Sequence, residues 1–397
     1  MKNKKNTQPK RINRREFLRL AALTGTILTV PQFAVACNSP DRRRRNATDH
    51  DAAHWRDYPI AAAARIAITA PNPHNTQAWK FSFDSPTMLT LYVDKNRILP
   101  ETDPPARQIH IGQGTFLELL RLSAASLGYA TEITLFPQGV YRYADIGKKP
   151  VASVKLKPDT TIRADALFAH WQSRVTNRSA YEGPAISADE FSKLSELAAP
   201  QTCTLRFLSQ GPQLSKISNL LYEAMKIETY DAQCADENYR WFRLSDHEIA
   251  EKADGTSLRG NAISGIKLWL ARSFYISSDK ASFLSKDNNE AYLKAFREGV
   301  QSTQGMVIFT TNNNTQTEWV KTGYDYLRFH LAATALGLSM HPLSQILQEY
   351  PAMDKLRTEL ENVMQVSAPA KMQMIVRLGR SDYRYFAPRR KISDLLI

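Results

Sequence analysis

The sequence predicts an α+β fold made of two similar helix–sheet halves within one chain of 397 residues. The first observation is a pair of helical segments, 114–127 and 323–336, that match at an offset of 209 residues. A glycine follows each segment, as is common where a helix ends. The matched pairs are Gly114 and Gly323, Leu122 and Leu331, Ala124 and Ala333, Leu127 and Leu336, and Gly128 and Gly337.

The segments around these helices also repeat. A strand-like segment follows each helix, at 151–156 and at 372–378. Ala-Pro turns recur at 70–71 and at 199–200, each after an amphipathic helix and before a strand. Coincidence between two ordinary amphipathic helices is the alternative, and the repeated surroundings favour two homologous halves.

We therefore predict a first half at 58–160 and a second half at 161–397, each in the order helix, turn, strand, helix, strand. The second half is longer because of residues 210–305, which are polar, rich in aromatic residues and patterned mainly as helix. We expect this insert to cover another part of the molecule.

The net charge of +13 is concentrated at the N-terminus. Residues 1–45 contain 12 Lys and Arg and 2 acidic residues, whereas the remainder contains 40 basic and 37 acidic residues. A basic surface for nucleic acid is therefore not indicated, and no nucleic-acid partner is expected.

Residues 1–37 are typical of an export signal. Arg14-Arg15 stands before Phe17-Leu18 and the modest apolar run 20–35, whose Gly, Pro, Thr and Gln make it too polar for an ordinary membrane anchor. The pattern resembles a twin-arginine signal, which is an address read by a receptor. We therefore expect an exported, periplasmic protein.

The end of the leader leaves two alternatives open. Residues 34–36 form an A-x-A cleavage site, and Cys37 could equally be the acylated cysteine of a membrane-tethered lipoprotein. Residues 38–57 are polar and arginine-rich, and we predict a flexible tether. In an oxidising compartment, Cys203 and Cys234 could pair. No spacing of Cys or His is typical of a metal site, so we predict no metal.

The segment 70–81, APNPHNTQAWKF, is the centre of the candidate site. Two prolines and two asparagines within six residues interrupt both helix and sheet. A predicted helix at 61–68 leads into the loop, and a predicted strand at 80–83 leads out of it. Asn75 and Gln77 carry donors and acceptors that suit a flat polar ligand. The alternative is a turn that binds nothing.

This loop is similar to the APSxHNxQPW loop of nitroreductase-family flavoproteins, with Asn72 in place of Ser and Ala78 in place of Pro. The resemblance implies a nitroreductase-like fold and a site for FMN, which that family contacts through this loop. The cofactor-binding residues it implies here are Asn72, Pro73, His74, Asn75 and Gln77.

In the second half, the segment 174–178, RVTNR, resembles the family's R-x-S-x-R motif and is followed by the aromatic residue Tyr181. Arginines can form paired hydrogen bonds with phosphate oxygens. A solvated helix end is the alternative. The resemblance implies that the FMN phosphate is bound by Arg174, Thr176, Asn177 and Arg178, and by Arg389 and Arg390 of the basic C-terminus.

The segment 337–345, GLSMHPLSQ, resembles the part of the family that follows the core helix. There a proline sets a tight turn, and a main-chain N–H faces N5 of the flavin. Ser-Gln stands here where many family members have Glu-Gly. His341 is a candidate general acid, with a structural hydrogen bond as the alternative. The cofactor-binding residues implied are Pro342, Leu343, Ser344 and Gln345.

The symmetry-related site lacks its parts. The second half has APQTCT at 199–204, about three residues shorter than the first loop and without Asn or Trp, and the first half has no arginine motif before Ala61. One FMN site per chain is therefore expected, an arrangement that resembles the Acg-like branch of the family. The two halves would then form a pseudo-dimer within a monomer.

The resemblance implies an exported FMN-dependent oxidoreductase, in which the flavin performs the hydride chemistry and no side chain need act as nucleophile or base. The expected acceptor is a nitroaromatic, a quinone or a similar small molecule. The donor is left open, because NAD(P)H is not expected outside the cytoplasm. The alternatives are a protein that stores FMN beneath the 210–305 insert without turnover, and a lipid-tethered scaffold without cofactor.

Overall fold

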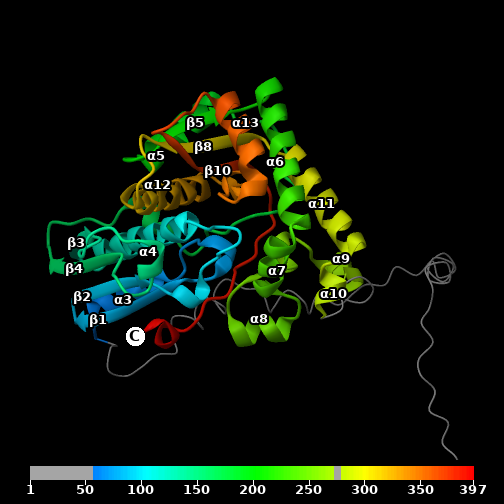
Figure 1. Ribbon diagram of the computed structural model, residues 1–397. Coiled ribbons are helices and arrows are strands. Elements are labelled where there is room, and N and C mark those ends of the chain that lie inside the picture. The colour runs from blue at the N-terminus through cyan, green and yellow to red at the C-terminus, as the bar shows by residue number, and fades with distance from the viewer. Residues whose placement is uncertain (1–56, 272–278) are drawn as a thin grey trace, which may run out of the picture. The chain divides into compact units, whose positions relative to one another are not determined.

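The computed structural model describes residues 57–271 and 279–397 (Figure 1). It contains two four-stranded antiparallel sheets with helices packed against them, which confirms the α+β class. The predicted leader, and all of the predicted tether except Asp57, lie outside the described residues. Within the described ranges, no helix is both long enough and apolar enough to span a membrane.

The first sheet has the strand order β1-β2-β4-β3, and all of its neighbouring strands are antiparallel. In β2, the buried residues Leu89, Leu91 and Val93 alternate with partly exposed ones, because successive side chains of a strand point to opposite faces. The elements of this half, in chain order, are α3 (Pro59–Ala67), β1 (Trp79–Ser85), β2 (Met88–Val93), α4 (Arg107–Ser126), β3 (Tyr129–Leu135) and β4 (Ala152–Pro158).

The second sheet has the order β5-β8-β10-β9 and is also antiparallel. Its central strands β8 and β10 are buried on both faces. The elements of this half are α5 (Ala188–Ala198), β5 (Thr204–Leu208), β8 (Gly305–Thr311), α12 (Gln316–Ala335), β9 (Ser339–Pro342), α13 (Asp354–Met364) and β10 (Lys371–Gly379). Apart from α13 and the insert, the order helix, strand, strand, helix, strand, strand is the same in both halves. Their common origin by duplication stays a prediction.

The predicted helices at 114–127 and 323–336 correspond to the C-terminal parts of α4 and α12, which both begin seven residues earlier. The first turn of α4 was not predicted as helix, because it carries polar side chains although it is buried in the structure. Arg107 is 1% exposed, and its guanidinium donates to Glu349 Oε1 at 2.7 Å and to the Leu347 carbonyl at 2.7 Å. Tertiary contacts with the second half, rather than an apolar stripe, therefore set the start of this helix.

The helices α4 and α12 cross where Gly114 and Gly323 meet. A Cβ atom on Gly114 would lie 1.8 Å from the Val320 carbonyl oxygen, and one on Gly323 would lie 2.1 Å from the Ile111 carbonyl oxygen. These contacts are reciprocal, because Ile111 and Val320 are separated by the same 209 residues as the two glycines. Reciprocal contacts of this kind are typical of a two-fold interface. The matched glycines in the sequence therefore allow a close helix crossing.

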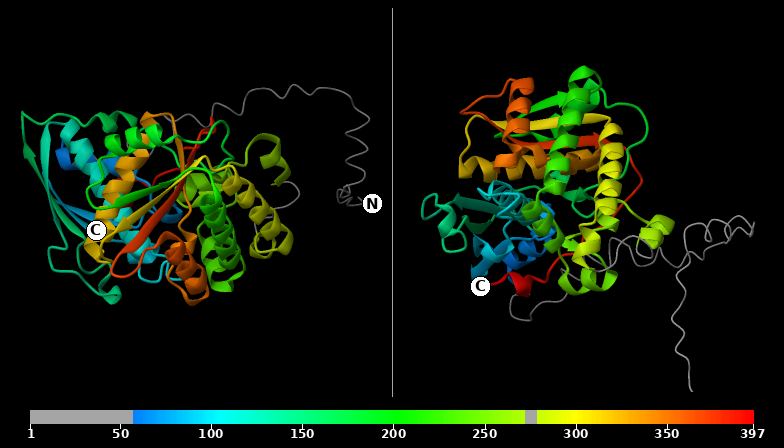
Figure 2. Two further views of the ribbon diagram at one scale, coloured as in Figure 1. Left: turned by 90° about the horizontal axis from the view of Figure 1, so that it is seen from above. Right: turned by 45° about the vertical axis from the view of Figure 1, so that its right-hand side comes forward.

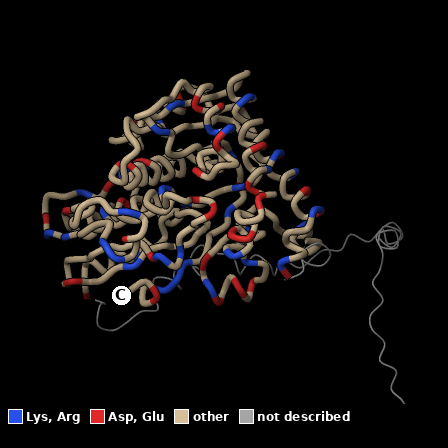
Figure 3. The backbone as a smooth tube through the Cα atoms, viewed as in Figure 1, with Lys and Arg blue, Asp and Glu red and all other residues tan. Residues whose placement is uncertain are grey.

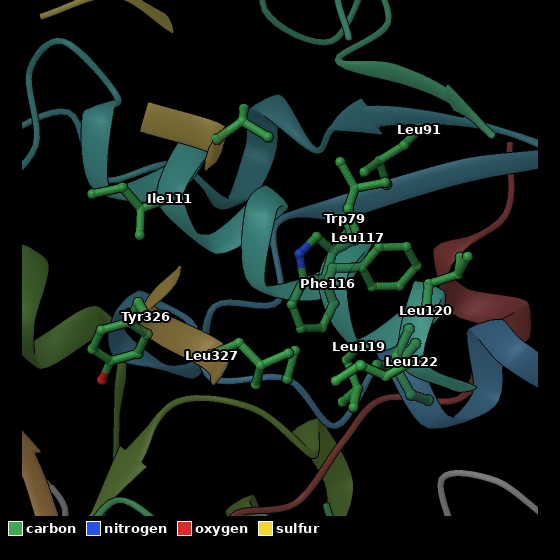
Figure 4. Close-up of a cluster of buried hydrophobic side chains, with 14 of the residues drawn as sticks. Trp79, Leu91, Ile111, Phe116, Leu117, Leu119, Leu120, Leu122, Tyr326 and Leu327 are labelled. Carbon is green, nitrogen blue, oxygen red and sulfur yellow. The ribbon is translucent and has the colours of Figure 1, made fainter. Parts of the chain in front are cut away.

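One hydrophobic core extends through both halves around this crossing (Figure 4). It includes Trp79 and Phe116 of the first half, whose ring centroids lie 5.3 Å apart, and Leu327 of the second half. The indole N–H of Trp79 donates to the Gly112 carbonyl at 3.2 Å, so this buried polar atom is satisfied. The core thus joins the two sheets into a single packed body.

A mostly helical insert connects β5 to β8 and lies beside the two sheets (Figures 1 and 2). Its long helices α6 and α11 run side by side. The two short strands pair in parallel. The insert consists of α6 (Pro212–Tyr230), α7 (Ala232–Arg240), β6 (Phe242–Arg243), α8 (Asp246–Lys252), β7 (Thr256–Ser257), α9 (Gly265–Leu270), α10 (Lys280–Phe283) and α11 (Lys286–Gln301).

The C-terminal segment leaves the second half and returns to the first. After β10, the chain runs to β1, where Leu396 bridges to Phe81 and the Ile397 N–H donates to the Phe81 carbonyl at 3.2 Å (Figure 1). The two cysteines that could have paired are separate buried thiols in this structure. Cys203 Sγ lies 3.5 Å from Thr322 Oγ1, whereas Cys234 belongs to the core beside the insert.

We predict that Gly323→Ala lowers the free energy of unfolding by about 3 kcal/mol or more, because the new methyl group forces the two helices apart. Chemical denaturation measures this loss. Gly299→Ala on α11 is the matched control. There a Cβ atom would meet Arg377 at an ordinary 3.6 Å, and alanine favours the helix. Equal stability of the two variants would contradict the close crossing.

Candidate functional site

The loop between α3 and β1 has an unusual backbone. His74, Asn75 and Gln77 have φ angles of 47°, 53° and 51°, in the left-handed region that residues other than glycine rarely adopt. Such conformations cost roughly 1–3 kcal/mol each and persist only where surrounding contacts hold them. One such contact is local, since the Gln77 N–H donates to Asn72 Oδ1 at 2.8 Å.

The insert and the C-terminal segment hold the same loop from outside. Asn75 Nδ2 donates to the Gly255 carbonyl at 3.2 Å, and the Gly255 N–H donates to the Asn75 carbonyl at 3.1 Å. Gln77 Nε2 donates to the Ala253 carbonyl at 2.9 Å, and Gln77 Oε1 accepts from the Arg390 N–H at 2.8 Å. Both ends of the buried Gln77 side chain are thus used within the protein, so Gln77 positions the loop.

A cavity of about 70 Å³ lies beside this loop. The first half contributes two asparagines and the second half contributes arginines, although the two motifs are about 100 residues apart in the chain. Six of the predicted cofactor-binding residues line the cavity: Asn72, Asn75, Arg174, Thr176, Arg178 and Arg389. Lining residues that the sequence analysis missed are Gly255, Thr256, Ser257 and Gly260 of the insert, and Tyr385 and Ala387 near the C-terminus.

Positive charge dominates this cavity. Arg174 and Arg389 are 4% and 8% exposed, and no Asp or Glu of the described ranges lines the cavity with them. Burial lowers the pKa of Arg174 to about 10, and burial together with the charge of Arg174 lowers the pKa of Arg389 to about 9. Elsewhere in the described chain, basic and acidic residues are interspersed (Figure 3). An anion in the cavity would therefore relieve the repulsion between these guanidinium groups.

Backbone carbonyls accept hydrogen bonds from these arginines and so fix the positions of their guanidinium groups. Arg389 Nε donates to the Ile68 carbonyl at 2.8 Å, and its Nη2 donates to the Thr69 carbonyl at 2.9 Å. Arg174 Nη2 donates to the same Thr69 carbonyl at 2.9 Å. Two arginines from distant segments thus meet at the C-terminal end of α3. Arg389 donates from Nε and from both Nη atoms to protein acceptors, so it adds positive charge to the cavity. Because a guanidinium group can fork onto phosphate oxygens, Arg178 together with the Thr176 hydroxyl supplies donors that fit a phosphate group.

Three of the predicted cofactor-binding residues, Asn177, Pro73 and Arg390, do not line the cavity. Asn177 fixes the arginine segment to β9, because its N–H donates to the Met340 carbonyl at 3.0 Å and its Nδ2 donates to the Tyr383 carbonyl at 2.8 Å. Pro73 packs near Gly112 of α4. The Arg390 guanidinium lies 3.9 Å from Asp94 Oδ2, and Arg390 is not among the lining residues.

The segment 342–345 follows β9 and does not line the cavity. Its Leu343 N–H donates to the Ile375 carbonyl at 2.8 Å, which attaches the turn to β10. Gln345 begins a short 3-10 helix, and its Oε1 is buried without a hydrogen-bond partner among the described residues. The expected contact of this turn with a flavin ring stays a prediction.

His341 is the residue considered as a general acid. It is buried, and Arg377 Nε donates to its Nδ1 at 3.0 Å. Burial, together with the positive charges of Arg377 and Arg178, holds the pKa of His341 well below its usual value. The ring is therefore neutral and cannot deliver a proton as an imidazolium, which favours the structural role.

The turn that corresponds to the loop in the second half carries an internal anion. The carboxylate of Asp325, which is 2% exposed, accepts hydrogen bonds from the N–H groups of Gln201, Thr202 and Cys203 at 2.9, 2.8 and 2.7 Å. Three charge-assisted bonds leave these backbone donors with no capacity for a ligand. No group of three His, Cys, Asp or Glu side chains within 57–271 and 279–397 could hold a metal ion.

We predict that inorganic phosphate raises the thermal stability of the protein, because it binds the folded cavity and not the unfolded chain. Phosphate at 100 times its dissociation constant would add about 2.7 kcal/mol. Arg178→Gln should lose this gain, which thermal unfolding with and without phosphate at constant ionic strength measures. Arg121→Gln is the control, since Arg121 pairs with Glu118 at 2.6 Å outside the cavity. An equal phosphate effect in both variants would contradict the assignment.

Comparison with known proteins relates this chain to nitroreductases. It is 25% identical over 352 residues to the "Putative NAD(P)H nitroreductase Rv3131" of Mycobacterium tuberculosis, covering 85% of this chain and 92% of that protein. It is 24% identical over 326 residues to the "Putative NAD(P)H nitroreductase acg" of the same organism, covering 81% and 88%. No protein-family model matches the chain. Over more than four-fifths of its length, the chain is thus similar to nitroreductase-type proteins, Acg among them.

Among solved structures, the FMN- and NADPH-dependent nitroreductase NfnB from a Sphigopyxis strain aligns with 58% of this chain and 98% of its own, at 12% identity and a TM-score of 0.39. NfnB from Mycobacterium smegmatis, an FMN-dependent nitroreductase solved in complex with NADPH, aligns with 56% of this chain and 92% of its own, at 16% identity and a TM-score of 0.35.

Proposed function

We propose that this chain is a flavin oxidoreductase that binds one FMN, with the phosphate group in the cavity lined by Arg174, Arg178 and Arg389. The observation that carries the proposal is the convergence of these arginines with Asn72 and Asn75 at one buried place without a carboxylate among the lining residues. The similarity to nitroreductases over most of the chain supports the same assignment.

The chain's own residues bind and orient the cofactor. Arg174, Arg178 and the Thr176 hydroxyl line the cavity and would hold the phosphate. Asn75 Oδ1 accepts from Arg389 Nη1 at 2.9 Å, so the loop of the first half aims the C-terminal arginine of the second. When bound, FMN supplies the hydride and electron transfer, and no side chain is needed as a nucleophile.

The cavity volume sets a condition on binding. About 70 Å³ is smaller than the roughly 300–1,000 Å³ of pockets that enclose a drug-sized ligand. Binding of a whole flavin therefore requires side chains or insert elements next to the cavity to move. Gly255 and Gly260 of the insert line the cavity, and we propose that the insert is the element that moves when the flavin binds.

The finer assignments remain part of this proposal. The acceptor is a nitroaromatic, a quinone or a similar small molecule, reduced by a monomeric protein. The protein is exported to the periplasm and, if Cys37 is acylated, is tethered to a membrane. The insert's place at the cavity favours a second candidate function, a protein that holds FMN beneath this cover without turnover.

We predict that the purified protein is yellow and releases FMN on denaturation, close to one molecule per chain. Arg178→Gln should lower the retained FMN at least tenfold, because it removes a charge-assisted bond to the phosphate. Arg389→Gln should lower it too, because Arg389 supplies positive charge to the cavity and holds the loop through Asn75 Oδ1. Absorbance after extraction measures the content, and Arg121→Gln should retain the wild-type amount. Colourless wild-type protein that stays colourless after incubation with FMN would rule out the proposed cofactor.

Redox titration separates the two candidate functions. A flavin that is bleached by NAD(P)H or dithionite and then reoxidised by a nitroaromatic or a quinone supports the oxidoreductase. A bound flavin that is inert to all of these donors and acceptors supports the holding function instead.

A further inference from the structure

A buried polar network links the insert to the strained loop. His74 Nε2 lies 2.9 Å from Asn238 Oδ1 on α7. Asn238 Nδ2 donates to Glu228 Oε1 on α6 at 3.0 Å, and Gln348 Nε2 donates to Glu228 Oε2 at 2.7 Å. The network thus joins four segments that are far apart in the chain.

The carboxylate of Glu228 determines which atoms of this network donate and which accept. Burial raises the pKa of Glu228, and the hydrogen bonds from Asn238 and Gln348 oppose this rise by stabilising the carboxylate. Both oxygens of the ionised Glu228 accept hydrogen bonds, so Asn238 presents its amide nitrogen to Glu228. The amide oxygen of Asn238 then faces His74, and because this oxygen can only accept, the proton of the imidazole has to reside on Nε2. The other ring nitrogen, Nδ1, is left with a lone pair.

The lone pair on His74 Nδ1 has no use within the protein. This atom is buried and has no hydrogen-bond partner among the described residues. Burial lowers the pKa of His74 to about 4, so the ring is neutral at pH 7. Unsatisfied buried acceptors are rare, because each costs roughly 1–3 kcal/mol. His74 itself does not line the cavity, but its neighbours Asn72 and Asn75 do. The charge of Arg178, another lining residue, contributes to the lowered pKa of His74, so the ring lies close to the cavity.

We propose that Asn238, held by Glu228, is a positioning residue that presents His74 Nδ1 as a hydrogen-bond acceptor to a donor group of the bound flavin. FMN carries such donors as the hydroxyls of its ribityl chain and the imide N–H of its ring. The inference rests on the proposed function for the identity of the ligand. It adds that Asn238, a residue of the insert, determines which ring nitrogen of His74 in the loop can accept a hydrogen bond.

Nitrogen NMR of protein labelled with ¹⁵N-histidine tests the first step without any cofactor. His74→Gln identifies the resonances of His74 among the eight histidines. The wild type is expected to show a single tautomer with the proton on Nε2. Asn238→Leu should release the ring into a mixture of tautomers. Gln348→Leu is the matched control, because it removes a bond to Glu228 but leaves the contact between Asn238 and His74.

Titration with FMN tests the second step. The Nδ1 resonance of the wild type should shift when FMN binds, and Asn238→Leu should weaken FMN binding about tenfold, the effect of one hydrogen bond to a buried partner. Gln348→Leu should bind FMN as the wild type does. A flavin methylated at the imide nitrogen distinguishes the two donors, since loss of the shift identifies the imide and its retention identifies a ribityl hydroxyl.

Two results would overturn the proposal. One is a tautomer in Asn238→Leu that equals the wild type, which would show that Asn238 does not orient the ring. The other is an Nδ1 resonance that FMN leaves unchanged although FMN binds, which would show that this nitrogen meets only water. Absence of FMN binding by the wild type would contradict the proposed function and the ligand named here. The tautomer of the unloaded protein would still decide the role of Asn238. If Asn238→Leu does not fold, Asn238→Ala serves for the same measurements.

Discussion

The structure depends on the contact of two backbones at the crossing of α4 and α12. Gly114 and Gly323 bring the two helices so close that neither position has room for a methyl group. The reciprocal contacts with the carbonyls of Ile111 and Val320 fix the rotation of one half relative to the other. Around this crossing, Trp79, Phe116 and Leu327 belong to one continuous core. A small shift of either helix would therefore move every residue that one half presents to the other.

The candidate site is a product of that arrangement. The loop after α3 belongs to the first half and the segment 174–178 to the second, so neither half can build the cavity alone. Arg174 and Arg389 meet at the carbonyl of Thr69, and burial together with the charge of Arg174 lowers the pKa of Arg389. Arg389 also donates to the Ile68 and Ala70 carbonyls and to Asn75 Oδ1, so its guanidinium group is held by several acceptors. The same surroundings prepare the two arginines for an anion.

The two corresponding turns differ in how their polar groups are satisfied. Around 201–203, the carboxylate of Asp325 satisfies three backbone N–H groups, so this turn is complete within the protein. In the first half, the loop is held by the Gly255 backbone and by Gln77, while His74 Nδ1 remains unsatisfied. The Asp325 carboxylate thus satisfies the N–H groups of one turn, whereas His74 Nδ1 in the other loop can still accept a hydrogen bond from a ligand.

The sequence by itself determined the α+β class, the matched glycines of the two repeated helices and six of the cavity-lining residues, because prolines, glycines and paired arginines act within a few residues of chain. It did not reveal the polar first turn of α4, whose Arg107 is buried against the second half. Only the tertiary structure decided that Gln77 supports the loop and that Ser257 lines the cavity. It also placed Asn238 within hydrogen-bonding distance of His74, a contact between residues more than 150 positions apart that leaves no local pattern in the sequence.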